Sequence, residues 1–274
     1  MNSGTPVLLP SSRSGLPALD VALRVVKEAG QTLVTRLHGE KEVSYKGRAN
    51  LVSDVDKLVE RQVIEELHGE FPDDGFLAEE SDAVPTNSEY TWIIDPLDGT
   101  RNYVLGIPFF CTVLALAKGN DVIMGLTYDP VRDEMFQAVK GGGAFLNGSA
   151  ITVSAKTELE DALLSYDLGY VDEEASTAIE LVLHLWPNIQ GTRIMGSAAL
   201  GLAYAACGRT DMYFHHNLCP WDIATGLVLV PEAGGVITDK YKTPSSLQAE
   251  SVIASGNTLH ARFLKATEGL AWRQ

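Results

Sequence analysis

The sequence predicts an α/β protein built from an α+β half over residues 1–153 and an α/β half over residues 154–274. Three observations predict this class: two helical periodicities open the chain, a run of short β segments follows them, and helices alternate with strands beyond residue 154. At 274 residues the chain exceeds the usual size of a single core, so it is one large domain or two fused ones. No internal repeat or long linker is present, so we expect the halves to pack closely.

Two helices are predicted near the start of the chain. Apolar residues recur at helical spacing over residues 17–37, which indicates an amphipathic helix. After a polar stretch, the second helix begins at Ser53, where Ser53 and Asp56 match the S-x-x-D capping box in front of an apolar run. The first 15 residues lack the basic and apolar regions of a signal peptide, and we expect a frayed tail there.

Short β segments make up the rest of the first half. A strand is predicted over residues 75–80 and another over residues 91–95. Turn sequences with Gly and Pro separate the segments that follow, which predicts an antiparallel meander over residues 109–117, 121–129, 134–139 and 143–147.

The second half alternates between strand and helix patterns, as α/β proteins do. The predicted strands cover residues 163–171, 192–196, 211–216, 236–239 and 252–256. The predicted helices cover residues 175–186, 197–208, 221–235 and a segment after residue 256.

Composition excludes several classes of protein. The 21 basic and 36 acidic residues give a net charge of −15, which disfavours direct binding to nucleic acid and favours cations as partners. No apolar run reaches 18 residues, so we expect no membrane span and no membrane partner. Without a signal sequence, the expected location is the cytoplasm.

Three cysteines, Cys111, Cys207 and Cys219, are too few and too scattered for a disulfide framework, and no CxxC pair suggests a zinc site. We expect all three to be reduced, and Cys111 and Cys207 to lie in the core.

The stretch DPLDGT over residues 95–100 carries the strongest chemical signal. Asp95 and Asp98 directly follow a predicted buried strand, Pro96 fixes one backbone angle, and Gly99 permits a sharp turn. Such a turn can bring two carboxylates to one side, where oxygen ligands suit Mg²⁺. The alternative is structural: Asp95 caps a turn through an Asx hydrogen bond and Asp98 is solvated.

Other acidic residues also stand at the ends of predicted elements, where functional sites are usually built. Glu79 and Glu80 end a strand, Asp56 opens a helix, and Asp222 opens another. Each has a structural alternative as well: a solvated strand end, a capping-box acid, and a charge that complements a helix dipole.

Four motifs in order point to a family. The stretches NLVSDVDKLVE, AEES, WIIDPLDGTRNY and PWDIATGLVLVPEAGG, followed by GGVITD, closely resemble the inositol monophosphatase family of magnesium-dependent, lithium-sensitive phosphatases. The resemblance covers nearly the whole chain, from about residue 50 to about residue 239. It implies the layered αβαβα sandwich of that family, hydrolysis of a small phosphate monoester such as an inositol or sugar phosphate, and a homodimer.

The resemblance also implies roles for particular residues. It implies that two or three Mg²⁺ ions are bound by Glu79, Asp95, the Leu97 carbonyl, Asp98 and Asp222. It assigns the orientation or deprotonation of an attacking water to Glu79, Thr100 and Asp56, and leaves open which of them is the base. Bare carboxylates would repel a phosphate dianion, whereas carboxylates loaded with Mg²⁺ attract it.

Further positions are implied to contact the substrate. Asp98, Gly99 and Thr100 lie at an expected helix start, where free N–H groups suit phosphate oxygens. For the alcohol part the resemblance implies Gly196, Ser197, Ala198 and His215. The first three have a structural alternative as a helix cap with small packed residues, and a histidine on a strand is often structural.

His215 is the clearest departure, because inositol phosphatases carry a glutamate at this position, seven residues before Asp222. A histidine can hydrogen-bond a hydroxyl or pair with a second phosphate or carboxylate. The substrate therefore stays open among inositol phosphate, fructose 1,6-bisphosphate, histidinol phosphate and adenosine 3′,5′-bisphosphate. Lys46 falls where the family has a mobile loop over the site; the alternative is a surface lysine.

Other classes of enzyme fit less well. A phosphatase that forms an aspartyl-phosphate would use SDVDK, but these residues open a helix. Neither a P-loop nor an HExxH zinc motif is present. A protein-binding role beside catalysis remains a second reading, since some bacterial relatives also contact the transcription machinery.

Overall fold

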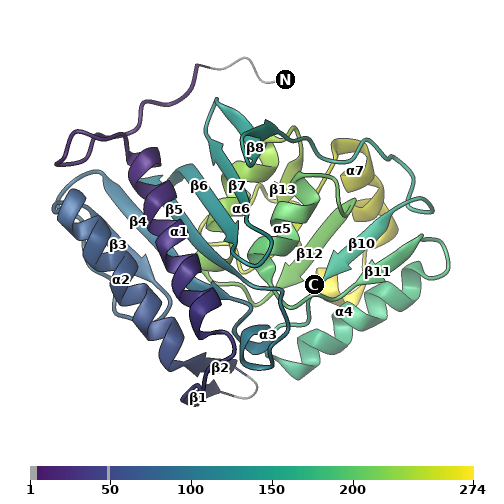
Figure 1. The fold of residues 1–274 in the computed structure, drawn as a ribbon. Coiled ribbons are helices and arrows are strands. Elements are labelled where there is room, and N and C mark those ends of the chain that lie inside the picture. Colours follow the sequence, from purple (N-terminus) through teal and green to yellow (C-terminus); the bar gives the residue numbers. More distant parts are fainter. Residues whose placement is uncertain (1–4, 48–49) are drawn as a thin grey trace.

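The structure is a computed structural model that describes residues 5–47 and 50–274, and Figure 1 shows its elements. Two large sheets dominate, with strand orders β3-β4-β5-β6-β7-β8-β9 and β11-β10-β12-β14-β13, beside the hairpin β1-β2. The strands are β1 Val43–Gly47, β2 Asn50–Ser53, β3 Gly75–Ala78, β4 Tyr90–Asp98, β5 Cys111–Lys118, β6 Asp121–Asp129, β7 Glu134–Val139, β8 Gly143–Leu146, β9 Ser149–Ala150, β10 Leu163–Tyr166, β11 Gly191–Arg193, β12 Met212–His216, β13 Val236–Thr238 and β14 Ser251–Ser255. The helices are α1 Ala18–Arg36, α2 Asp54–Glu70, α3 Thr100–Val104, α4 Asp172–Leu185, α5 Ala198–Ala206, α6 Pro220–Glu232 and α7 Asn257–Ala266, with a final 3₁₀ turn, Ala271–Arg273.

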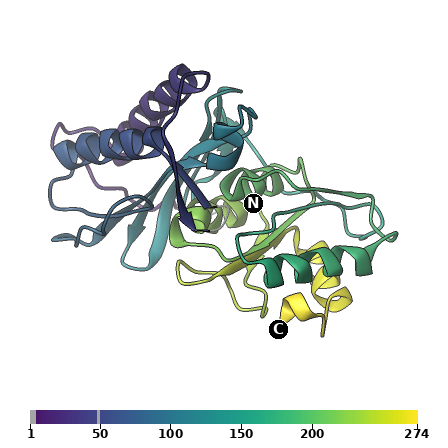
Figure 2. The same cartoon turned by 90° about the horizontal axis from the view of Figure 1, so that it is seen from below.

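The elements stack in five layers. Helices α1 and α2 cover one face of the seven-stranded sheet, α5 and α6 lie between the two sheets, and α4 and α7 cover the far face of the five-stranded sheet (Figures 1 and 2). Alternation along β12 shows why: Met212 and Phe214 face the outer apolar cluster, whereas Tyr213 faces the cluster around α5 and α6. The predicted αβαβα sandwich is confirmed.

The two N-terminal helices form as predicted. On α1, Val21, Val25 and Ala29 share one buried face. At the start of α2 the capping box is present: the Ser53 hydroxyl accepts a hydrogen bond from Val55 N, and Asp56 Oδ2 accepts one from Ser53 N at 2.9 Å.

Strands β3 and β4 precede the predicted antiparallel meander and pair differently from it. They run parallel, with Ala78 beside Ile94, and the chain between them returns along the outer edge of β3 through a bridge between Phe76 and Val84. Because parallel strands end at the same edge of a sheet, Glu79 after β3 emerges next to Asp95 on β4. The remaining pairs from β4 to β9 are antiparallel, as predicted.

A bulge in β4 sets the direction of its aspartates. Asp95 pairs with Val113 and Asp98 with Cys111, so β4 holds one residue more than β5 between these pairs. Residues three apart on a regular strand point to opposite faces. The bulge, which contains Pro96, breaks this alternation and lets both carboxylates face the same pocket.

The predicted frayed tail is wrong for the described residues 5–15. Val7 N donates to Lys140 O at 2.9 Å and Arg13 N to Glu70 O at 2.8 Å, while Val7 and Leu9 pack against the core under α1 and α2. Apolar contacts distant in sequence therefore hold a segment whose local composition is typical of a loop. The side chain of Lys46, which was expected to lie over the site, is outside the described part of the chain.

The sheets divide the chain between β9 and β10, although one apolar cluster draws residues from both sides of residue 153. The boundary at residues 153 and 154 thus stays a prediction. The three cysteines are free; Cys111 is buried as predicted, Cys207 is half-buried and Cys219 is exposed. No helix in the described ranges is long and apolar enough to cross a membrane, and the cytoplasmic location stays a prediction.

Candidate active site

A pocket of about 340 Å³ opens where the two halves meet. Its walls are formed by the end of β4 together with α3, by the segment after β10, and by the turn before α5. The loop before α6 and the start of α6 complete the pocket. All the residues that the sequence analysis singled out as ligands line this pocket: Glu79, Asp95, Leu97, Asp98 and Asp222. Segments more than 140 residues apart in sequence, such as Glu79 and Asp222, therefore share one site.

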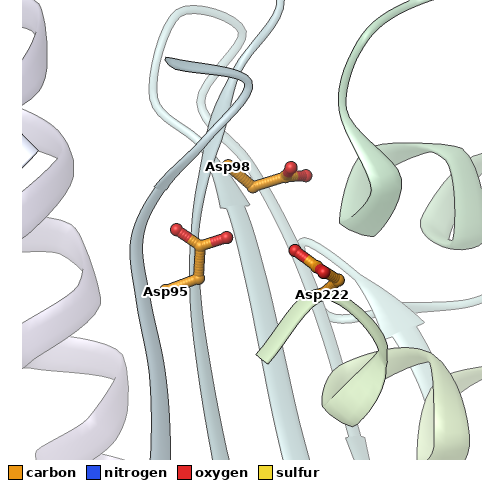
Figure 3. A group of neighbouring side chains, drawn as sticks. All are labelled: Asp95, Asp98 and Asp222. Atoms are coloured by element: carbon orange, nitrogen blue, oxygen red, sulfur yellow. The ribbon is translucent and has the colours of Figure 1, made fainter. Parts of the chain in front are cut away.

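Three carboxylates converge in the pocket (Figure 3). Asp95, Asp98 and Asp222 each present an oxygen within 4.8 Å of the other two. Asp95 and Asp98 are buried and Asp222 is half-buried. Burial raises the pKa of Asp95 well above its ordinary value, and the charges of Glu79, Asp98 and Asp222 raise it further. Such a cluster is stabilised by a cation.

Asp95 is held by its own turn. Its Oδ1 accepts a hydrogen bond from Leu97 N at 2.9 Å, which is the Asx contact of the structural alternative. The contact engages Oδ1 alone, and the Asp95 carboxylate lies beside those of Asp98 and Asp222 (Figure 3). The two interpretations of Asp95 are therefore compatible, because one oxygen fixes the side chain while the carboxylate still belongs to the cluster.

Asp98 is buried. The structural alternative in which Asp98 is solvated is therefore wrong. Its oxygens accept hydrogen bonds from the Ser197 hydroxyl at 2.5 Å, from Ala198 N at 3.2 Å and from Ala199 N at 2.8 Å. These donors form the N-terminus of α5, whose free N–H groups favour a negative charge. The groups of Ser197 and Ala198 that were expected to contact the substrate are thus engaged in orienting Asp98.

Asp222 sits in the first turn of α6, after Pro220 at the first helical position. Its Oδ2 accepts a hydrogen bond from Cys219 N at 2.6 Å, so the helix cap fixes the carboxylate beside the β4 aspartates. The capping role expected as an alternative is present, and it positions the same side chain for the cluster.

Thr100 and Asp56 are hydrogen-bonded to each other beside the cluster. The Thr100 hydroxyl lies 2.9 Å from Leu97 O and 3.0 Å from Asp56 Oδ1. Asp56 Oδ2 accepts hydrogen bonds from Ser53 N at 2.9 Å and from the Ser53 hydroxyl at 2.5 Å. Asp56 is not among the described residues that line the pocket, whereas Thr100, its hydrogen-bond partner, is. Gly99, with φ of +91°, makes the turn from β4 into α3.

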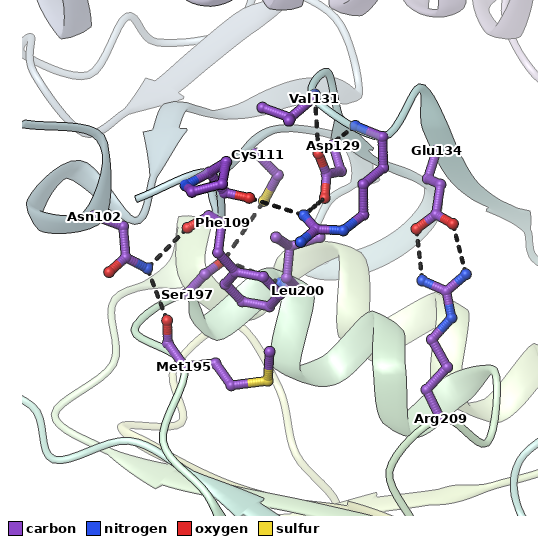
Figure 4. Close-up of polar contacts among 12 residues, drawn as sticks. Asn102, Phe109, Cys111, Asp129, Val131, Glu134, Met195, Ser197, Leu200 and Arg209 are labelled. Atoms are coloured by element: carbon purple, nitrogen blue, oxygen red, sulfur yellow. Dashed lines mark hydrogen bonds and ion pairs between the residues drawn. The ribbon is translucent and has the colours of Figure 1, made fainter. Parts of the chain in front are cut away.

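Two residues that sequence analysis missed hold the turn before α5. Asp167 Oδ1 accepts hydrogen bonds from Met195 N at 3.1 Å and Gly196 N at 2.7 Å, and Asn102 Nδ2 donates to Met195 O at 2.7 Å (Figure 4). The Gly196 N–H is thereby committed to Asp167. A signal existed for Asp167, which directly follows an apolar strand as Asp95 does; Asn102 lay inside the quoted motif without an assigned role.

Asn102 also ties this turn to the start of β5. The second hydrogen of its amide is donated to Phe109 O at 2.8 Å (Figure 4). Arg132 holds Phe109 in place through two contacts. It donates a hydrogen bond to Pro108 O at 2.9 Å, and its guanidinium lies 5.5 Å from the Phe109 ring centroid. Asn102 therefore joins α3 to the segment before β5 and to the turn before α5.

His215 lines the pocket from the end of β12 and is buried, with 7% of its surface exposed. Its Nδ1 lies 3.0 Å from Asp167 O. Burial lowers the pKa of His215 to about 3, and the neighbouring His216 lowers it further, so the ring is neutral at physiological pH. The predicted position beside the pocket is present in the structure, and a contact with substrate stays a prediction.

Known proteins are similar to this chain in sequence and in fold. The sequence profile of the inositol monophosphatase family matches residues 16–270. An inositol monophosphatase of Dictyostelium discoideum is 38% identical over 256 residues, which are 90% of this chain and 93% of that protein. A relative named Nus factor SuhB, from Xylella fastidiosa, is 37% identical over 228 residues, 81% of this chain and 82% of its own. The crystal structure of the extragenic suppressor protein suhB from Bartonella henselae superimposes with a TM-score of 0.88 at 35% identity, covering 92% of this chain and 98% of that one. The chain therefore belongs to the inositol monophosphatase family and is a phosphatase, a phosphoric monoester hydrolase.

Proposed function

We propose that the chain hydrolyses a small phosphate monoester, an inositol monophosphate or a related sugar or polyol phosphate, in a magnesium-dependent reaction that Li⁺ inhibits. Attack by a water molecule directly on phosphorus needs no covalent enzyme intermediate. The observation that carries the proposal is the convergence of Asp95, Asp98 and Asp222 within 4.8 Å in a pocket large enough for such an ester.

The donor set fits a hard divalent cation. Carboxylate oxygens and a backbone carbonyl are the ligands that Mg²⁺ takes, and the set contains neither sulfur nor imidazole. We assign Glu79, Asp95, the Leu97 carbonyl, Asp98 and Asp222 as the residues that hold two or three ions. Bound Mg²⁺ would supply positive charge for the phosphate oxygens and would lower the pKa of a water ligand.

The chain's own groups hold the reacting parts in place. Leu97 N and the N-terminus of α5 fix the directions of Asp95 and Asp98 before anything binds. Because Asp56 Oδ1 accepts from Thr100, the Thr100 oxygen can in turn accept a hydrogen from a water in the pocket, and the proton can pass toward Asp56. Glu79 is the alternative base, since it lines the pocket directly. The N–H groups of Gly99 and Thr100 are assigned to the phosphate.

Phosphate release from a panel of esters tests the proposal. The panel contains inositol 1-phosphate, fructose 1,6-bisphosphate, histidinol phosphate, adenosine 3′,5′-bisphosphate and glycerol 2-phosphate, each with Mg²⁺, with EDTA, and with Mg²⁺ plus Li⁺. We expect release that requires Mg²⁺ and decreases with Li⁺. Release that continues in EDTA would contradict the metal-dependent mechanism, and no release from any ester by a protein that binds Mg²⁺ in calorimetry would contradict the substrate class.

A homodimer is also proposed, and an apolar surface beside the pocket supports it. This surface, the α3 patch, contains Leu105, Ile107, Tyr170, Val171 and Ile194, which are all exposed, Leu105 by 68%. Helix α3 contacts the segment that carries Tyr170 and Val171, because Arg101 on α3 lies 5.5 Å from the Tyr170 ring centroid. Exposed apolar patches mark association sites. Sedimentation should show a dimer that Leu105→Glu converts to monomer; an unchanged dimer in this variant would exclude the α3 patch.

A protein-binding role is the second candidate, and the observation that favours it is the relative named Nus factor SuhB. The two functions are separable, because a binding surface would survive the loss of one carboxylate in the pocket, whereas hydrolysis would not. A pull-down with wild-type protein and the Asp95→Asn variant, scored beside phosphate release, distinguishes them.

A further inference from the structure

We propose that Asp167 is a positioning residue for the metal site: it holds the turn before α5, and that turn orients the Asp98 carboxylate. The affinity of the pocket for Mg²⁺ therefore depends on a side chain that acts through its neighbours. The inference rests on the proposed Mg²⁺-dependent function and deepens it, because it names the residue that sets the direction of one carboxylate in the cluster.

Asp98 depends on the second half of the chain for its orientation. Its closest hydrogen-bond donors all belong to residues 197–199 at the N-terminus of α5. Asp95 differs, because its donor Leu97 N lies two residues away on the same strand. A displacement of the start of α5 would therefore turn Asp98 and leave Asp95 in place, which would change the distances between the oxygens of the cluster.

The turn that leads into α5 is held by side chains. Strand β11 ends at Arg193, and Met195 makes no backbone-to-backbone hydrogen bond in the described part of the chain. Met195 N donates instead to Asp167 Oδ1 at 3.1 Å, and Met195 O accepts from Asn102 Nδ2 at 2.7 Å (Figure 4). Gly196 N adds a second bond to Asp167 Oδ1 at 2.7 Å. Asp167 from one half and Asn102 from the other thus hold the same turn.

Asp167 is itself fixed by the neighbouring strand β12. Its side chain directly follows β10 and is buried, with 6% of the residue exposed. Asp167 Oδ2 accepts from the Tyr213 hydroxyl at 3.0 Å, and Asp167 O lies 3.0 Å from His215 Nδ1. Because β10 and β12 are paired, these contacts anchor the acceptor to the five-stranded sheet. The sheet therefore positions the turn, and the turn positions Asp98.

The turn requires an acceptor oxygen from Asp167 and does not require its charge. A single oxygen, Oδ1, accepts from both amides of the turn. Burial raises the pKa of Asp167 to about 6, although its hydrogen bonds act in the opposite direction. Asparagine keeps one oxygen for the two amides and offers an N–H group to the Tyr213 oxygen, which can accept it. Alanine removes both contacts.

The test measures how much Mg²⁺ each variant needs. One readout is the Mg²⁺ concentration that gives half of the maximal increase in unfolding temperature, and the other is the concentration that gives half-maximal phosphate release. We expect Asp167→Ala to raise both by about 10–100-fold, because removing a group that orients a metal ligand typically lowers metal affinity by this factor. Asp167→Asn should keep most of the wild-type affinity. An unchanged Mg²⁺ requirement in Asp167→Ala, or equal losses in both variants, would overturn the inference.

Asp211→Ala is the matched control for a loss of stability alone. Asp211 is buried and holds the other end of β10, where it accepts from Leu163 N at 2.7 Å and from Lys156 Nζ at 2.9 Å. It is not among the described residues that line the pocket. We expect a lower unfolding temperature with an unchanged Mg²⁺ requirement. If this variant needed as much additional Mg²⁺ as Asp167→Ala, general destabilisation would explain the effect and the inference would be wrong.

A double variant tests whether the two side chains act through the same turn. Asn102→Ala alone should also raise the Mg²⁺ requirement, by about tenfold. Because a turn that is already released cannot be released again, Asp167→Ala combined with Asn102→Ala should lose little more than either single variant. Losses that multiply to about 100-fold would show independent effects and would overturn the route through the turn. A wild type whose unfolding temperature does not respond to Mg²⁺ would contradict the proposed function itself, and this inference with it.

Discussion

Replacing Asp95 with asparagine should lower the rate of phosphate release by at least about a thousandfold and should raise the stability of the metal-free protein. The first effect follows because Asp95 belongs to the carboxylate cluster with Asp98 and Asp222 and is one of the residues proposed to hold the ions. Several kcal/mol of charge stabilisation come from bound metal, and each 1.4 kcal/mol is about tenfold in rate. Steady-state kinetics at saturating Mg²⁺ measures this loss.

The second effect follows from the electrostatics of the empty cluster. Burial and the charges of Glu79, Asp98 and Asp222 raise the pKa of Asp95, which means that its ionised form destabilises the folded, metal-free protein. Asparagine removes that charge, and its Oδ1 can still accept from Leu97 N. Thermal unfolding in EDTA should therefore occur at a higher temperature in the variant, and the increase that Mg²⁺ produces in the wild type should shrink.

Asp74→Asn is the matched control. Asp74 is also buried with a raised pKa, but it lies outside the pocket and accepts from Ser88 Oγ at 2.7 Å and Trp92 Nε1 at 3.0 Å. An asparagine has one acceptor oxygen for these two donors, so this variant should lose about 1–3 kcal/mol of stability and keep its turnover. If Asp95→Asn retained Mg²⁺-dependent turnover, or if both variants shifted stability alike, the assignment of Asp95 would be wrong.

The sequence predicted what depends on local patterns. The capping box at Ser53 and the apolar face of α1 need only neighbouring residues, and both are present as expected. The candidate ligands were predictable because the resemblance to the inositol monophosphatase family implied them. Without that resemblance, Asp95 and Asp222 each had a structural explanation. The structure shows that these explanations are also true, because the Asx contact orients the Asp95 carboxylate and the helix cap orients the Asp222 carboxylate.

What the sequence could not predict depends on contacts between distant segments. The parallel pairing of β3 and β4 places Glu79 beside Asp95, yet a strand pattern carries no information on the direction of its partner. Asp167 lies 28 and 29 residues from the amides it binds, and Asn102 lies 93 residues from Met195. Packing of residues 5–16 likewise depends on partners near Glu70 and Lys140.

Gly99→Ala is the second change for which we expect a large effect. Gly99 has φ of +91°, which an L side chain adopts only with strain. A Cβ there would lie 3.0 Å from Phe109 O, 3.2 Å from Phe110 Cα and 3.3 Å from Gly196 O. All three are backbone atoms on two different segments, so no flexible side chain can move aside. The backbone of Gly99 or of these neighbours must therefore give by a few tenths of an ångström, which disturbs Asp98 and Thr100 on either side of Gly99.

Gly106→Ala separates strain from crowding. Gly106 also has positive φ, +73°, but no atom lies within 4 Å of the position of its Cβ. It should lose only the conformational penalty, about 1–2 kcal/mol, and keep its activity. Gly99→Ala should lose about 3 kcal/mol or more, because the crowded backbone adds to that penalty. Its kcat should fall about tenfold, because a displacement of a few tenths of an ångström beside the reacting centre lowers the rate less than the 100-fold that a displacement of 1 Å can cause. Urea unfolding and steady-state kinetics on both variants measure these losses. Equal stability losses, or full activity in Gly99→Ala, would show that the turn between Asp98 and Thr100 tolerates a side chain and that the close approach of Phe109 and Gly196 does not position the site.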